Sequence, residues 1–249
     1  MTAVLSVPVG AVRSPHGAAT TVLLHLAPGA VGLLAFVGLL PLAGALGLPS
    51  VAALAGVGLF VVPAVQLGIL EVHRRRRPFD PAVALGVRLP LPRVLGWAVL
   101  EIVLAGAMFM LTAPLTRLIQ TRLFGWWPDA WTIRLRTDGL YSDEALLITA
   151  ALLLLGTVLV APVVEELYFR GFLLPRMPQR LGAWRVPAHV ALFAGYHLYS
   201  PWLTPTRVIA ILPLAYVALR TQDVRIGMVA HVVLNATDLA AILLFTGTR

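Results

Sequence analysis

Residues 145–170 read ALLITAALLLLGTVLVAPVV followed by EELYFR, and the rest of the chain is organised around this stretch. Its first twenty residues carry no formal charge and are long enough to cross the hydrocarbon core of a bilayer as a helix. A charge at such depth persists only if it is paired or faces a wet cavity. Glu166 and Arg170 share one helix face at a spacing of four, whereas Glu165 points about 100° away. We therefore expect Arg170 to hold Glu166 and to leave Glu165 available.

The composition indicates one membrane domain. The 249 residues are 59% hydrophobic and 12% charged, which excludes a water-soluble core. The net charge of +8 comes from Arg alone, and the Arg residues lie in loops beside apolar runs, which is typical of membrane orientation and lipid contact and not of nucleic-acid binding. There is no cysteine, so disulfides and thiolate metal sites are excluded.

The pattern of apolar runs predicts an all-α membrane protein, a polytopic bundle of about seven transmembrane helices. The charge-free run from Ser14 to Leu70 is divided by the turn signal Gly47–Ser50 into two spans. We expect the other five spans at Val94–Thr116, from Ala145 toward Pro175, and at Val186–Tyr199, Arg207–Leu219 and Ile226–Phe245. The predicted organisation is an N-terminal arm at 1–21, helices with a Trp-containing surface segment at 22–144, and a helical core at 145–245 that contains the central stretch.

The arginines predict the orientation. The cluster His73–Arg77 marks residues 71–93 as cytoplasmic, and thirteen of the nineteen Arg then lie on that side. We expect an integral, multi-pass protein of a bacterial cell membrane. Membrane lipids are its first expected partners.

Two further polar pairs follow the central stretch. One is Phe193 with His197, and the other is His231 with Asn235, each at a spacing of four residues. At ~1.5 Å per residue, Glu165, His197 and Asn235 lie roughly 15–17 Å from the cytoplasmic ends of their helices and His231 ~9 Å. Alone, the acids could mark a helix end among headgroups, the His a satisfied interior residue and the Asn a bond between helices. Their common depth favours one buried site.

These three ordered motifs, Glu-Glu-x-x-x-Arg, Phe-x-x-x-His and His-x-x-x-Asn, resemble those of the CPBP family of intramembrane proteases. That family includes the type II CAAX prenyl endopeptidases and relatives linked to bacteriocin immunity. The resemblance covers roughly residues 145–245. It implies an intramembrane endopeptidase whose catalytic helical core is 145–245 and whose active site lies toward the cytoplasmic side. The expected partner is then a peptide or protein substrate at the membrane, with CAAX-like substrates as one candidate class.

The resemblance also implies a role for each residue. Glu165 would be the general base, with His197 holding the same water, and His231 and Asn235 would stabilise the oxyanion. Glu166 and Arg170 would orient Glu165, with Arg170 offering charge for a substrate carboxylate, and Phe193 would pack the helix of His197. Asp238 follows Asn235 by three residues, so it either supports Asn235 or is hydrated at the outer interface.

The use of a metal stays open at this stage. No cofactor is certain from the sequence. A divalent ion such as zinc could be held by Glu165, His197 and His231, although the His-Glu-x-x-His helix of ordinary zinc proteases is missing. Metal and glutamate mechanisms are both compatible with the motifs. Two other classes also remain, a transporter, for which no internal repeat is evident, and a non-catalytic membrane immunity or binding protein.

Overall fold

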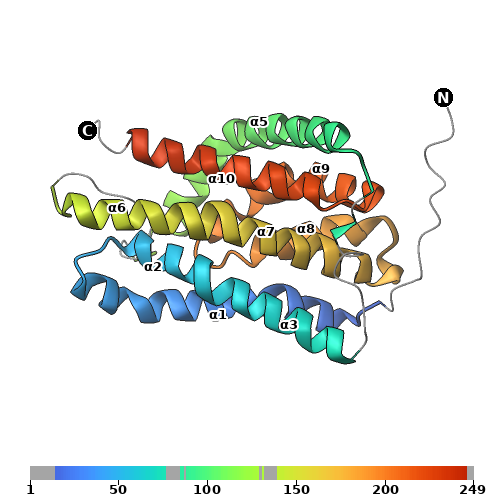
Figure 1. Cartoon of the computed structure of the whole chain (residues 1–249), viewed down its shortest axis with the longest axis horizontal. Coiled ribbons are helices and arrows are strands. Elements are labelled where there is room, and N and C mark those ends of the chain that lie inside the picture. The colour runs from blue at the N-terminus through green and yellow to red at the C-terminus, as the bar shows by residue number, and fades with distance from the viewer. Residues whose placement is uncertain (1–14, 77–84, 87, 129–130, 132–138, 246–249) are drawn as a thin grey trace.

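The structure is a computed structural model that describes residues 15–76, 85–86, 88–128, 131 and 139–245 (Figure 1). Within these residues the secondary structure is helical and contains no strand. The N-terminal arm up to Ser14, Arg77 in the arginine cluster and residues 132–138 of the surface segment lie outside the described residues.

Six helical stretches in the described part of the chain are long and apolar enough to cross a membrane. Three of these stretches contain π-helical or 3-10 segments, labelled η, where the backbone departs from the α-helix. The stretches are α1 (Ala18–Ala45); α2 (Ser50–Gly56), η1 (Val57–Val61) and α3 (Val62–Arg76); α5 (Leu91–Leu123); α6 (Asp143–Leu152), η3 (Leu153–Val160), α7 (Ala161–Glu165), η4 (Glu166–Leu173) and η5 (Leu174–Arg176); η7 (Pro201–Leu203) and α9 (Thr204–Thr221); and α10 (Arg225–Phe245).

The seventh expected span is shorter than predicted. Helix α8 (Arg185–Gly195) follows the 3-10 segment η6 (Gln179–Trp184) and has 11 residues, which gives a length of only ~16 Å. It ends before His197, because the chain turns there ahead of Ser200-Pro201, where a helix cannot continue. The polytopic all-α bundle is therefore confirmed, with six long stretches and α8, and His197 lies in the turn after α8.

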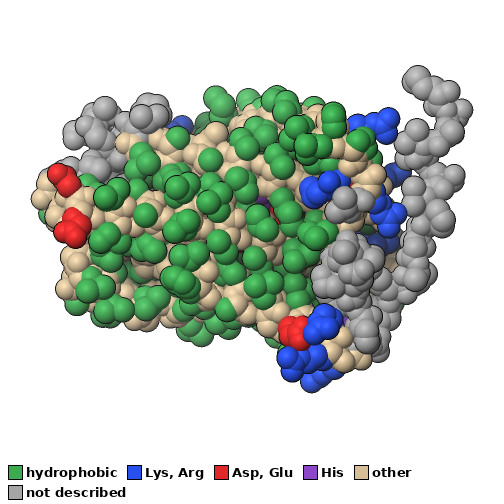
Figure 2. All heavy atoms as spheres, in the orientation of Figure 1, with side chains coloured by type: hydrophobic (Ala, Val, Ile, Leu, Met, Phe, Trp, Pro, Cys, Tyr) green, Lys and Arg blue, Asp and Glu red, His purple; other side chains and the backbone are tan. Residues whose placement is uncertain are grey.

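The surface of the bundle suits a bilayer. Figure 2 shows hydrophobic side chains across the flank of the molecule, acidic side chains at one end, and many Arg side chains together with a further acidic one at the other. Large apolar side chains are exposed, for example those of Leu34, Met110 and Leu147, each more than 70% exposed. Such a surface is stable in lipid and not in water.

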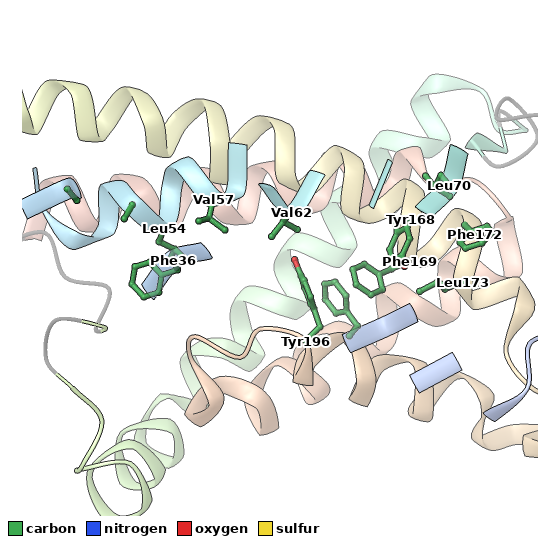
Figure 3. Close-up of a cluster of buried hydrophobic side chains, with 13 residues drawn as sticks. Phe36, Leu54, Val57, Val62, Leu70, Tyr168, Phe169, Phe172, Leu173 and Tyr196 are labelled. Carbon is green, nitrogen blue, oxygen red and sulfur yellow. The ribbon is translucent and has the colours of Figure 1, made fainter. Parts of the chain in front are cut away.

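The interior is aromatic where the central stretch meets α8. Tyr168, Phe169, Phe172 and Phe193 are fully buried in one cluster that also includes Tyr196 (Figure 3). This cluster brings together η4, α8 and the inner face of α1 and α3. Helix α10 packs on η3 and α7 on one side and on α5 on the other. The central motif is thus enclosed by helices from both halves of the chain.

Asp223 links the N-terminal ends of α5 and α10, which lie at the Arg-rich end of the bundle. Its carboxylate is fully buried and accepts hydrogen bonds from the backbone N–H groups of Arg88 and Leu89 and from the side chain of Arg225. Arg225 Nη2 also donates to the carbonyl of Leu89 at 2.7 Å. Burial raises the pKa of Asp223, but the hydrogen bonds from Arg225, Leu89 and Arg88 outweigh it, so the pKa lies below its ordinary value.

Candidate active site

Glu166 is the centre of a buried ion cluster. Arg170 Nη1 lies 3.0 Å from Glu166 Oε1, and both side chains are 1% exposed. His231 of α10 brings its Nδ1 to 3.2 Å from the same oxygen. The expected pairing of Glu166 with Arg170 is present, and His231 joins it from a helix 65 residues further along the chain. Glu166 therefore links η4 to α10.

Glu165 has a partner that its helix alone cannot supply. The hydroxyl of Tyr196 donates a hydrogen bond to Glu165 Oε1. In Figure 3 the side chain of Tyr196 extends away from the end of α8 with its oxygen at the tip. Glu165 is 6% exposed, and its other oxygen, Oε2, has no hydrogen-bond partner among the described residues. Oε1 of Glu165 is thus hydrogen-bonded, and Oε2 is available. The free carboxylate expected from the sequence is therefore found at one of the two oxygens only.

Phe193 is the common contact of the site. The Arg170 guanidinium carbon lies 3.9 Å from the centroid of the Phe193 ring, which is a cation–π arrangement. The rings of His197 and His231 lie against Phe193 with centroid distances of 5.2 Å and 6.4 Å. Because Phe193 is fully buried, it fixes the two histidines relative to Arg170. Phe193 thus contacts three polar side chains of the site, Arg170, His197 and His231.

His197 is held in one ring orientation. Its Nδ1 lies 3.1 Å from the carbonyl oxygen of Phe193. A carbonyl can only accept, so Nδ1 carries the hydrogen and Nε2 is left with a lone pair that can accept one from water. The ring also contacts Tyr196 at a centroid distance of 4.3 Å, so His197 packs directly against the partner of Glu165.

Asn235 and Asp238 lie further along α10. Asn235 Nδ2 donates to the carbonyl of Thr157 in η3 at 2.7 Å, which ties α10 to the central helix. This bond is the helix-to-helix role that an Asn in lipid often has, and it leaves one N–H of the amide for another acceptor. Asp238 is exposed on the same helix and is in electrostatic contact with Arg207 and His231.

The three residues named for a metal do not form a metal site. Among the described residues, no three His, Asp or Glu side chains are grouped closely enough to hold an ion. The hydrogen bonds recorded for these three residues involve Glu165 Oε1 and the Nδ1 atoms of His197 and His231. As they are arranged in the described part of the chain, Glu165, His197 and His231 do not converge on a common point where a zinc ion could be held.

Sequence reasoning missed several polar residues near the site. Tyr196 stands inside the Phe193–His197 motif, and its place beside His197 was a usable signal. Arg207 of α9 donates to the backbone and hydroxyl oxygens of Ser200 and is in electrostatic contact with Glu165. His25 of α1 is bonded to His189 of α8, Nε2 to Nδ1, at 2.9 Å, and both are fully buried. No spacing in the sequence indicates that pair, because 164 residues separate its members.

In a comparison with known protein families, residues 147–237 match the Rce1-like family, whose description is "Type II CAAX prenyl endopeptidase Rce1-like". No curated protein and no solved structure matched the chain. The matched region includes the three motifs, from Glu165 through Asn235, and leaves out α1 to α5. The resemblance is thereby confirmed: through residues 147–237 the chain is similar to the Rce1-like type II CAAX prenyl endopeptidases of the CPBP family of intramembrane proteases.

Proposed function

We propose that the protein is an intramembrane endopeptidase that hydrolyses peptide bonds of membrane-associated, CAAX-like substrates with Glu165 as its general base. The observation that carries this proposal is the environment of Glu165. It is a buried carboxylate on a membrane helix, held at Oε1 by Tyr196, with Oε2 unused among the described residues. The rings of His197 and His231 both pack against the ring of Phe193. A family match that spans these residues supports the reaction class.

The proposed mechanism uses side chains alone. Glu165 Oε2 takes one proton from a water molecule while Nε2 of His197 accepts a hydrogen bond from the other O–H. The oxygen attacks the peptide carbonyl carbon, and the carbonyl π electrons move to oxygen to give a tetrahedral oxyanion. The remaining N–H of Asn235 and, with His231 in its imidazolium form, the Nε2–H of His231 stabilise that charge from α10. Glu165 then gives its proton to the amide nitrogen as the C–N bond breaks and an amine and a carboxylic acid form.

Replacing Glu165 with glutamine tests the proposal. Glu165→Gln should lower kcat/KM for a CAAX peptide in proteoliposomes by about 10²–10⁴, because the amide keeps the shape but cannot take a proton. Tyr196→Phe should cause a smaller loss, since it frees Glu165 without removing it. Tyr216→Phe on the exposed side of α9 is the matched control and should cleave normally. A folded Glu165→Gln protein with normal turnover would show that another group is the base.

The substrate class follows from the same assay. Matched peptides with and without a prenyl group, offered at equal membrane density, measure whether the lipid is recognised. Inactive Glu165→Gln protein can then be used to capture bound peptides from membranes for mass spectrometry.

We also propose that the Arg-rich end of the bundle faces the cytoplasm. The support is the positive-inside distribution of Arg around α3, together with acids in the first turn of α6 at the opposite end. The chain has no cysteine, so single cysteines can report each side. A cysteine at Val72 should react only once the cytoplasmic side is opened, and one at Trp126 should react in intact cells; both positions are exposed. Reversed labelling would invert the orientation.

A further inference from the structure

Glu101 lies on the inner face of α5, a helix outside the family match. Val94, Ala98, Glu101 and Ala105 recur at spacings of four, three and four, so they share one face of α5, and each is at most 1% exposed. Val94 and Ala98 pack in one cluster with Ile226 and Ala230 of α10. Glu101 therefore extends the seam between α5 and α10 toward the turn of α10 that carries His231.

The carboxyl of Glu101 has no visible compensation. Neither of its oxygens has a hydrogen-bond partner among the described residues. An ionised carboxylate in that condition inside a membrane bundle is strongly disfavoured. Glu166, another acid, is in electrostatic contact with Glu101. Two neighbouring acids in an apolar seam cannot both be charged unless each has its own cation or donors.

Glu166 is the one of the two that is held as an anion. Arg170 and His231 both approach its Oε1. Its Oε2 lacks a donor among the described residues and lies against the backbone of α10 at Gly227, where there is no room for a Cβ. A protonated carboxyl has one O–H to donate, and Glu166 Oε2 accepts no hydrogen bond among the described residues. A protonated Glu101 therefore offers the hydrogen-bond donor that Glu166 Oε2 lacks.

Among the described residues, no other ionisable side chain near α5 donates a hydrogen bond to Glu166 Oε2. Helices α9 and α10 pack on α5. The ionisable side chains that they bring are Arg207, Tyr216 and Arg220 from α9, and Arg225, His231 and Asp238 from α10. Arg225 is committed to Asp223, and His231 already bonds Oε1 of Glu166.

We propose that Glu101 is a positioning residue of the candidate active site. Its carboxyl group carries a proton and donates its O–H to Glu166 directly or through one buried water. It thereby fixes the carboxylate that holds His231 and Arg170. The effect on turnover rests on the proposed function, whereas the hydrogen-bonded, protonated state of Glu101 does not.

Infrared spectroscopy of the purified protein in lipid tests the protonated state without any substrate. The wild-type protein should show the C=O stretching band of a protonated carboxylic acid at neutral pH, and Glu101→Gln should remove it. Glu144→Gln, which removes an exposed acid in the first turn of α6, is the matched control and should leave the band in place. A spectrum unchanged by Glu101→Gln overturns the proposal.

Peptide cleavage tests the positioning role. Glu101→Leu should stay folded, because leucine suits an apolar seam, yet kcat should fall on the order of tenfold or more with KM nearly unchanged, since His231 loses its fixed support. Glu101→Gln should recover most of that loss, because an amide N–H can replace the O–H. A Leu variant with wild-type kcat overturns the positioning role. If wild-type protein cleaves nothing, the proposed function fails, and the infrared band alone decides the state of Glu101.

Discussion

Glu166→Gln should largely abolish the folded protein recovered from membranes. The change leaves the Arg170 cation buried at 3% exposure, with its countercharge removed and the Phe193 ring against it. Breaking one side of a buried ion pair costs about 3–5 kcal/mol. That is a large part of the total stability of a typical domain, which is roughly 5–15 kcal/mol. Size-exclusion chromatography and thermal unfolding after solubilisation in detergent measure the loss.

The neighbouring acid is the control for this prediction. Glu165→Gln keeps an oxygen that can accept from Tyr196 and leaves the ion pair of Glu166 with Arg170 intact, so its folded yield should match the wild type. The double variant Glu166→Gln with Arg170→Met should recover folded protein, because the unpaired charge is gone. If Glu166→Gln alone elutes and melts as the wild type does, the ion pair contributes little and the two glutamates have been assigned the wrong roles.

The sequence allows the local part of the site to be predicted. Glu166 and Arg170 are four residues apart on one helix, and that spacing alone places the carboxylate beside the guanidinium. Charge-free runs likewise predict where the helices lie, because the thickness of a bilayer sets their length. The turn at 47–50 falls between α1 and α2 as expected.

The contacts between helices could not be predicted from the sequence. The bond from Tyr196 to Glu165 depends on where α8 ends, which is set by the turn before Pro201 and by packing of α8 on α1 and α9. His25 and His189 meet only because α1 crosses α8. Glu101 appears in the sequence as a single charge in an apolar run, and only the seam with α10 indicates its neighbour. In each case the partner lies on a helix whose rotation the sequence pattern does not define.

Gly29→Ala should damage the site from α1, outside the family match. A Cβ at Gly29 would overlap the backbone carbonyl oxygen of Tyr196 and lie 2.9 Å from its carbonyl carbon. Backbone atoms cannot rotate away as a side chain can, so either α1 or the turn carrying Tyr196 and His197 must move. Overpacking of this kind costs about 1–3 kcal/mol. A displacement of about 1 Å at the catalytic groups can cost roughly 10²-fold in turnover.

Gly38→Ala on the same helix separates this clash from helix propensity. A Cβ at Gly38 meets no atom of the described chain within 4 Å. Alanine there should raise stability by about 0.5–1 kcal/mol, because it stiffens the unfolded chain and favours the helix. Peptide cleavage and thermal unfolding of the two variants in the same lipid give the comparison. If Gly29→Ala matches Gly38→Ala in both measurements, α1 does not press on the turn of His197; if only Gly29→Ala loses turnover, the first helix is part of what positions the candidate catalytic residues.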